Sequence, residues 1–145
     1  MEENRIGGRA AILAVVTAVV TLLAATVGAD QGDTIRVSVD STGNQGNDTS
    51  SFPSISADGR YVAFSSTADN LVSGDANGFA DVFVHDTASG VTSRVSIDSN
   101  GVEGNKSSSS PSLSSDGRYV AFSSHATNLV PGDVNQRACQ VLCVR

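Results

Sequence analysis

The stretch Gly74-Asp75-Ala76-Asn77-Gly78-Phe79-Ala80-Asp81 carries the residue types and spacing that best fit a metal site. Asp75 and Asn77 alternate, which places two oxygen-bearing side chains on one side of a tight loop, and Asp81 returns a second carboxylate. Calcium takes about 6 to 8 oxygen ligands, and short loops of this kind can supply some of them. The loop therefore predicts a calcium ion at Asp75, Asn77 and Asp81. The alternative is that these side chains only bond their own backbone in an exposed turn.

Histidine and cysteine give weaker signals. His85 and His125 are the only histidines, and no Gly-x-Ser-x-Gly elbow accompanies them. Cys139 and Cys143 are four residues apart and can form a local link or bind a metal, but no histidine lies near them in the sequence. We therefore expect no catalytic residues, no certain cofactor, with calcium as the candidate, and a protein that is not an enzyme.

The segments that must position these residues occur in two tandem copies in the sequence. Sliding the sequence by 58 positions aligns residues 36–77 with 94–135 without a gap, and 29 of those 42 positions are identical. Repeats of roughly this length mark solenoids and propellers. Asp133 and Asn135 repeat the first part of the calcium loop, but Gln136 and Cys139 replace its last two key positions, which makes a second intact site doubtful.

Each repeat has the pattern of short antiparallel strands. The first repeat predicts strands at 53–56, 60–65, 81–85 and 91–97. The Asp58-Gly59 pair between the first two strands is a hairpin signal, because glycine accepts the positive φ of a tight turn. The second strand is apolar on both faces, which implies cover on both sides. No segment after the first thirty residues has a helical period, so the fold class is all-β.

The motif Pro-Ser-[Ile/Leu]-Ser-x-Asp-Gly-Arg-Tyr-Val-Ala-Phe-Ser-Ser in both repeats resembles the repeat of TolB-like, WD-repeat-like β-propellers. The sequence from Asn70 to Asp86, Asn-Leu-Val-x-Gly-Asp-x-Asn-Gly-x-x-Asp-Val-Phe-Val-x-Asp, resembles a secreted bacterial subgroup of that family. This resemblance implies β-propeller blades of four antiparallel strands. It says little about activity, because propellers carry many functions.

Only about one and a half blades are expected. An outermost strand at 34–39 precedes one blade that ends at Ile97, and the second repeat supplies two more strands. Closed propellers have roughly 4 to 8 blades. The chain is therefore expected to be a truncated part of a longer propeller, or to assemble with copies of itself. Residues 136–145 diverge from the first repeat, either through a change of reading frame in the coding DNA or as a true divergent end.

The first residues predict export from the cell. Residues 1–29 combine two arginines, a long apolar run and a small-residue exit, as in a signal peptide. The apolar run is also close to the length that spans a bilayer, so an uncleaved membrane anchor stays an alternative. The repeats occupy 30–135 and face a secreted, periplasmic or other cell-envelope location. The net charge of −6 leaves no basic patch for nucleic acid.

These features predict a secreted or envelope-associated module that binds or scaffolds a protein or glycan partner, with the loop at 67–80 as its site. One alternative is the non-catalytic propeller part of an extracellular hydrolase or lyase. Another is a degraded gene fragment without stable function.

Overall fold

The computed structural model describes residues 32–133 and 140–144. Residues 34–145 form one compact unit, and the description below concerns that unit. The signal peptide predicted for residues 1–29 and the positions of Asn135, Gln136 and Cys139 lie outside the described residues.

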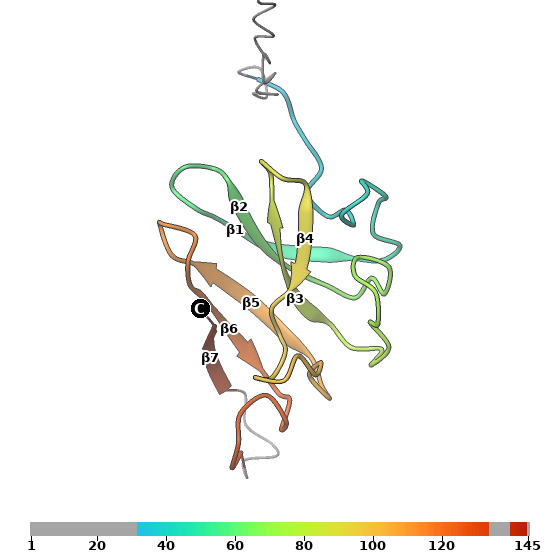
Figure 1. Cartoon of the computed structure of the whole chain (residues 1–145), viewed down its shortest axis with the longest axis vertical. Helices are drawn as coiled ribbons and strands as arrows, with labels where there is room; N and C mark the ends of the chain where they lie inside the picture. The colour runs from blue at the N-terminus through green and yellow to red at the C-terminus, as the bar shows by residue number, and fades with distance from the viewer. Residues whose placement is uncertain (1–31, 134–139, 145) are drawn as a thin grey trace, which may run out of the picture. The chain divides into compact units, whose positions relative to one another are not determined.

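Seven strands form two antiparallel sheets (Figure 1). Sheet 1 has the order β1-β2-β3-β4 and sheet 2 the order β5-β6-β7. The strands are β1 (Ser50–Ile55), β2 (Tyr61–Ser66), β3 (Asp81–Asp86), β4 (Val91–Arg94), β5 (Ser108–Leu113), β6 (Val120–Ser124) and β7 (Gln140–Val144). The described chain is thus all-β and has no helix, and its four-stranded and three-stranded sheets are consistent with about one and a half blades.

The Asp-Gly turns form as expected in both repeats. Gly59 and Gly117 follow Asp58 and Asp116 with φ of 74° and 71°, in the region that favours glycine. The first strand of each sheet also carries a bulge, between Ser51 and Ser54 in β1 and at the matching place in β5. The two repeats therefore share their irregularities as well as their regular pairing.

Sheet 2 has one strand more than the sequence predicted. Strand β7 pairs with β6 across five positions, from Ser124 opposite Gln140 to Val120 opposite Val144. In sheet 1 the equivalent pairs run from Ser66 opposite Asp81 to Val62 opposite His85. The connecting loop is one residue longer in the second repeat, 125–139 against 67–80, so β7 is displaced by one position from a gapless alignment. That displacement hid the strand from a comparison at a fixed offset of 58.

The outermost strand predicted at 34–39 is absent as a strand. Only Val39 makes an isolated bridge, to Gln45. The repeat equivalent of this segment, 92–97, includes part of β4, which pairs with β3. A strand needs a neighbour for its backbone hydrogen bonds, and segment 34–39 has no β3 beside it in the described chain.

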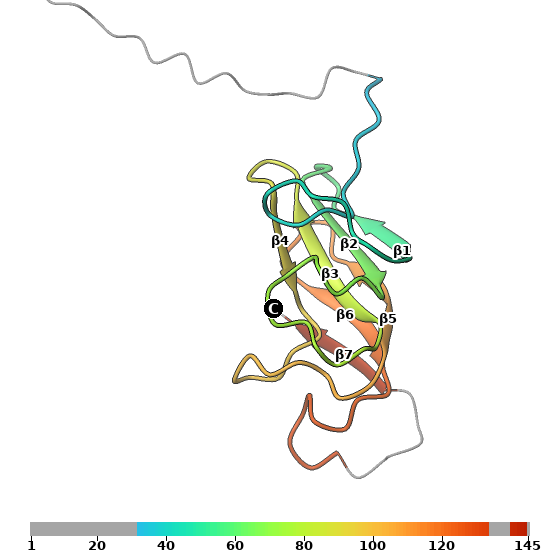
Figure 2. The ribbon, with the colours of Figure 1, turned by 90° about the vertical axis from the view of Figure 1, so that its right-hand side faces the viewer.

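The two sheets pack face to face (Figures 1 and 2). One face of β2 and β3 meets one face of β6, and the buried residues of this core are Ala63, Val82, Val120, Phe122, Ala126 and Leu129. The opposite face of sheet 1 holds a second cluster of Phe64, Phe83, Ala68 and Leu71. The rings of Phe64 and Phe83 are 5.8 Å apart. Strand β2 is therefore covered on both faces, as its sequence predicted.

Close backbone contacts fix the position of one sheet against the other. The amide of Leu113 donates to Ser54 Oγ at 2.9 Å, and the amide of Ala57 donates to the Ser115 carbonyl at 2.9 Å. A Cβ added to Gly117 would lie 2.3 Å from the Tyr61 ring, so this ring covers the second Asp-Gly turn. The interface between sheets is thus built from matched parts of the two repeats. No helix among the described residues is long and apolar enough to cross a membrane.

Candidate functional site

Asp81, the last residue of the predicted calcium loop, is a buried structural group. Its side chain is fully buried at the start of β3. Ser96 Oγ donates to Asp81 Oδ1 at 2.6 Å, and Asn77 Nδ2 donates to Asp81 Oδ2 at 2.9 Å. Ser96 Oγ in turn accepts the amide of Val82 at 3.0 Å. The carboxylate therefore ties the start of β3 to the segment that follows β4.

An arginine lies among the acidic groups of this loop. Arg94 Nη1 is 3.2 Å from Asp75 Oδ1, 3.3 Å from Asp81 Oδ2 and 2.7 Å from Glu103 Oε2. Its Nη2 donates to the Gly74 carbonyl at 3.1 Å. Only 9% of the Arg94 side chain is exposed. One cation thus offsets three carboxylates whose oxygens lie within 4.8 Å of one another.

Asn77 turns its amide nitrogen, and not its oxygen, toward this cluster. Its Nδ2 donates to Asp81 and to the Gly104 carbonyl, each at 2.9 Å. Its Oδ1 accepts the amide of Phe79 at 2.7 Å, as an Asx turn requires. The side chain therefore closes its own loop and bonds the turn before β5.

Burial raises two of the pKa values in the cluster. Burial, the largest cause, together with the neighbouring Asp81 and Glu103 carboxylates, raises the pKa of Asp75 to about 6, against the attraction of Arg94. Burial also raises the pKa of Asp81, although its hydrogen bonds from Ser96 and Asn77 oppose the change. The cluster holds more negative charge than its single arginine neutralises.

The arrangement does not fit a calcium ion as it stands. Calcium requires about 6 to 8 oxygen ligands, whereas here the guanidinium of Arg94 lies between the carboxylates and the oxygen of Asn77 is engaged by a backbone amide. Asp75 and Asp81 do come together, and Glu103 joins them in place of Asn77. The calcium site at Asp75, Asn77 and Asp81 stays a prediction, and it would require Arg94 to move.

A polar cleft lies beside this loop and gives it a second candidate role. It has a volume of about 340 Å³ and is enclosed by the turn after Val39, the loop between β2 and β3, and one residue of β4. Its lining residues are Asp40, Ser41, Thr42, Asn70, Leu71, Val72, Ser73 and Thr92. Hydroxyl, amide and apolar groups thus line one opening, which suits a ligand with both backbone-like polar groups and small apolar groups.

Local hydrogen bonds hold one wall of the cleft. Asp40 Oδ1 accepts the amides of Thr42 and Asn44, both at 2.8 Å. The side-chain amide of Asn44, which donates to Asp40 Oδ2, and then its backbone amide hold the pKa of Asp40 well below its usual range. Ser41 Oγ accepts the amide of Thr92 at 3.0 Å, which fixes the turn against β4.

The other wall is tied to the segment before β1. Asn70 Oδ1 accepts the amide of Asn47 at 2.9 Å, and Asn70 Nδ2 donates to the Gln45 carbonyl at 2.9 Å. Gly46 lies against this loop, because a Cβ there would be 3.2 Å from the Leu71 side chain and 3.3 Å from Ala68. The cleft is therefore preformed, which lowers the entropy lost on binding.

His85 has a structural contact under the cleft. It is 6% exposed on β3, and its Nδ1 is 2.9 Å from Thr92 Oγ1. The Thr92 hydroxyl has a single hydrogen and donates it to the Val39 carbonyl at 2.5 Å, so His85 Nδ1 must be the donor in the first bond. Burial lowers the pKa of His85, which favours the neutral ring.

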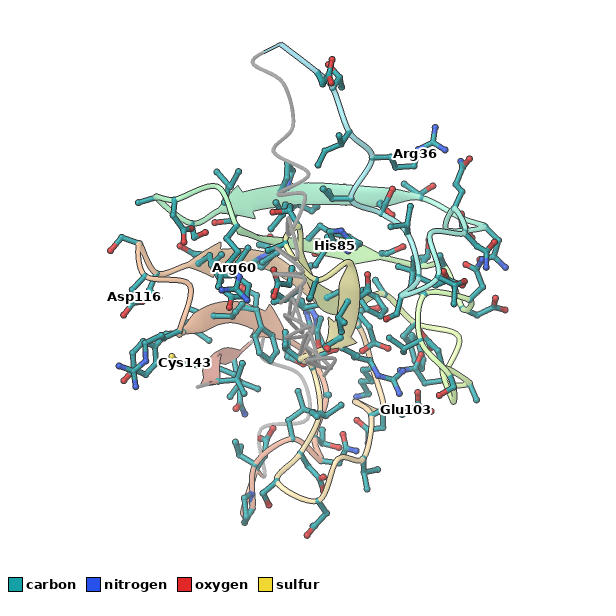
Figure 3. All side chains as sticks on the ribbon, turned by 45° about the horizontal axis from the view of Figure 1, so that its top comes forward. Arg36, Arg60, His85, Glu103, Asp116 and Cys143 are labelled. Atoms are coloured by element: carbon teal, nitrogen blue, oxygen red, sulfur yellow. The ribbon has the colours of Figure 1, made fainter. Side chains whose placement is uncertain are left out.

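The remaining reactive side chains are separate from His85. Figure 3 shows His85, Glu103 and Cys143 in different parts of the unit. His125 and Cys143 are exposed, the latter on β7. His85 and Cys143 are therefore not gathered in one place.

Sequence reasoning missed Arg94, Ser96 and Glu103 as partners of the predicted loop. Arg94 lies opposite Phe83 in the pairing of β3 with β4, at the other end of the register from Asp86 opposite Val91. Glu103 is the only glutamate after residue 3. That rarity was the one available signal, and it carried no information about which loop Glu103 would meet.

Neither models of known protein families nor curated proteins give a match to this chain.

Proposed function

We propose that the chain is a secreted or cell-envelope module of the TolB-like β-propeller type that binds an extended protein segment and acts as a scaffold. The polar cleft between the turn at 40–42 and the loop at 70–73 carries this proposal. Its walls are fixed by hydrogen bonds to β4 and to the segment before β1. Loops on a rigid β-frame are a common arrangement for recognition.

The chemistry of the cleft favours a peptide. The exposed Ser73 side chain at the cleft can exchange hydrogen bonds with peptide groups, while Val72 offers contact to a small apolar side chain. The chain's net charge of −6 and the carboxylate of Asp40 at the cleft favour a segment that carries a basic residue.

Selection of a displayed random-peptide library against the full chain tests this function. We expect enrichment of peptides with a basic residue, and loss of their binding in Ser73→Arg, which places a large side chain at the cleft. Pro131→Arg is the matched control, because Pro131 is the exposed repeat equivalent of Ser73 in the second loop. Equal binding by the wild type and Ser73→Arg, or enrichment of glycans alone on an array, would contradict the peptide cleft.

Calcium is the second part of the proposal and has its own test. A structural ion at Asp75, Asn77 and Asp81 predicts that calcium raises the melting temperature of the full chain and that a chelator lowers it. The rise must vanish in Asp75→Ala. If Arg94 is instead the resident cation, calcium leaves the melting temperature unchanged in the wild type.

A further inference from the structure

Sheet 1 exposes residues that its counterpart buries. Ile55 on β1 is 62% exposed, whereas its repeat equivalent Leu113 on β5 packs against the core between the sheets. Pro53 is exposed and its equivalent Pro111 is buried. A groove of about 180 Å³, lined largely by apolar surface at Val37, Pro53 and Phe64, continues this region. We call it the first open face.

Sheet 2 shows the opposite imbalance. Val141 on β7 lies opposite Ser123, as Val82 on β3 lies opposite Ser65. Val82 is fully buried between the sheets, whereas Val141 is 78% exposed. Cys143, also exposed, lies opposite Ala121 in the place that Val84 takes opposite Ala63. We call the surface at Ala121, Val141 and Cys143 the second open face.

These two faces are the separate halves of an interface that exists intact within the chain. In the core, the face of sheet 1 with Ala63, Val82 and Val84 meets the face of sheet 2 with Leu113 and Phe122. The second open face, with Val141, is the repeat equivalent of the sheet 1 surface with Val82. The first open face, with Ile55, is the repeat equivalent of the sheet 2 surface with Leu113. We propose that a second copy of the chain is the occupant, with the second open face of one copy packed on the first open face of the next.

The turn glycines support this head-to-tail packing. Within the chain, the ring of Tyr61 covers Gly117, whose added Cβ would be 2.3 Å away. The equivalent pair across the proposed interface is Tyr119 over Gly59. A Cβ added to Gly59 would meet nothing within 4 Å, so the turn has room for a ring.

Charge and backbone pairing support it as well. Arg94 on β4 lies opposite Phe83 and beside Asp75. Its equivalent Arg36 lies in segment 34–39, which has no strand partner among the described residues. Laid along β7 of a second copy, this segment supplies the fourth strand of sheet 2. Arg36 then lies opposite Leu142, the counterpart of Phe83, and close to Asp133, the counterpart of Asp75.

Every copy carries both open faces, so the contact is heterologous and continues until a ring closes. Rings of this architecture have roughly 4 to 8 sheets, which corresponds to about two to four copies with two sheets each. This inference rests on the propeller part of the proposed function and is independent of the peptide cleft.

Sedimentation velocity of the full chain over a range of concentrations tests the proposal. We expect the wild type to sediment as a closed assembly, and Val141→Asp and Ile55→Asp each to sediment as monomers with unchanged circular dichroism. Mixing the two variants should restore one interface, because each retains the face that the other lacks. The mixture should therefore give a heterodimer and stop there, whereas a dimer in which one face packs on the same face of its partner would be broken by only one of the two variants.

Val102→Asp is the matched control. Val102 is 52% exposed, lies outside both open faces, and has polar Asn44 as its repeat equivalent, so this variant should assemble like the wild type. A monomeric wild type, association of all variants alike, or failure of the mixture to form a heterodimer would overturn the proposal.

Hydrogen exchange of β7 in the wild type gives a measurement that needs no variant: its amides should become protected as the concentration rises, and concentration-independent exchange would count against the interface. If the chain is monomeric but still binds peptides, the assembly proposal fails while the proposed peptide cleft stands.

Discussion

Sheet 1 and sheet 2 are formed by nearly the same sequence, but they differ in the number of strands and in how far their faces are covered. Sheet 1 has four strands and buried residues on both faces, although Ile55 leaves part of one face exposed, whereas sheet 2 has three strands and exposes Val141 on its outer face. The same residue type in the same place is buried in one sheet and exposed in the other, as Val82 and Val141 show. Burial in this fold is therefore set by the neighbouring sheet and not by the strand's own sequence.

The largest expected difference in stability between equivalent positions of the two repeats is at Arg94 and Arg36. Replacing Arg94 with Met leaves three carboxylates without their cation, and removing one member of a buried ion pair costs roughly 3–5 kcal/mol. The same change at Arg36, its exposed equivalent, should cost much less in the Ile55→Asp background, where the proposed association of copies should be lost. Urea unfolding of both variants checks the difference. Equal losses would mean that the Arg94 cluster has no special role in stability.

The turn glycines give the next largest difference. Gly117→Ala must displace the Tyr61 ring, and overpacking of this kind costs about 1–3 kcal/mol. Gly59→Ala has a similar positive φ but no neighbour to displace, so in the Ile55→Asp background it should show only the smaller backbone cost. The difference between the two variants measures the cost of the clash with the Tyr61 ring, because the backbone strain from positive φ is common to both. Thermal melts of the two variants measure it, and equal shifts in melting temperature would place the Tyr61 ring elsewhere.

The valine pair probes the core directly. Val82→Ala removes two buried methyl groups, at about 0.8 kcal/mol for each, and should destabilise the chain by about 2 kcal/mol. Val141→Ala in the Ile55→Asp background should change the free energy of unfolding very little, because that side chain is exposed. A loss at Val141 as large as at Val82 would show that other residues of the chain cover β7.

The smallest expected effect is a pH dependence. The pKa of Asp75 is raised to about 6 in the folded chain, above its ordinary value, so the folded chain binds this proton more tightly than the unfolded chain does. Its contribution to stability is complete below the ordinary pKa and is lost as the pH rises through about 6. The pKa values of Asp40 and Asp86 are lowered, chiefly by hydrogen bonds from Asn44 and from Arg60, and their contributions are lost in the opposite direction, as the pH falls below their ordinary range.

Asp75→Asn removes the first of these titrations. Relative to the wild type it should gain stability above pH 6 and gain little below pH 4. Melting temperatures across this range test the prediction, with Asp133→Asn, the repeat equivalent, as control. A constant difference between Asp75→Asn and the wild type across the range would exclude a raised pKa at Asp75.

The sequence was sufficient for the fold class because its signals are local. The Asp58-Gly59 turn and the apolar β2 depend only on neighbouring residues, and each predicts its element correctly. Strand β7 was missed because a single extra loop residue displaced it from the fixed offset. The strand expected at 34–39 was wrong because a strand depends on a partner, which local sequence does not reveal.

The candidate site shows the same limit. Asp75 and Asp81 were found from their spacing, and the structure does bring them together. The role of Arg94 depends on its register against β3, and that of Glu103 on how the turn before β5 folds back. Neither follows from spacing along the chain, so the cation that balances these carboxylates could not be predicted.

The packing of Tyr61 on Gly117 has a consequence for how such a gene can change length. Both sides of the contact between sheets recur at an interval of one repeat, so recombination between the two repeats would add or remove a unit that carries a complete set of complementary surfaces. A chain lengthened by a second copy of residues 36–93 would keep every inter-sheet contact and move the exposed valine of β7 one sheet further along. The repeat is therefore the unit in which this protein can grow or shrink without redesign.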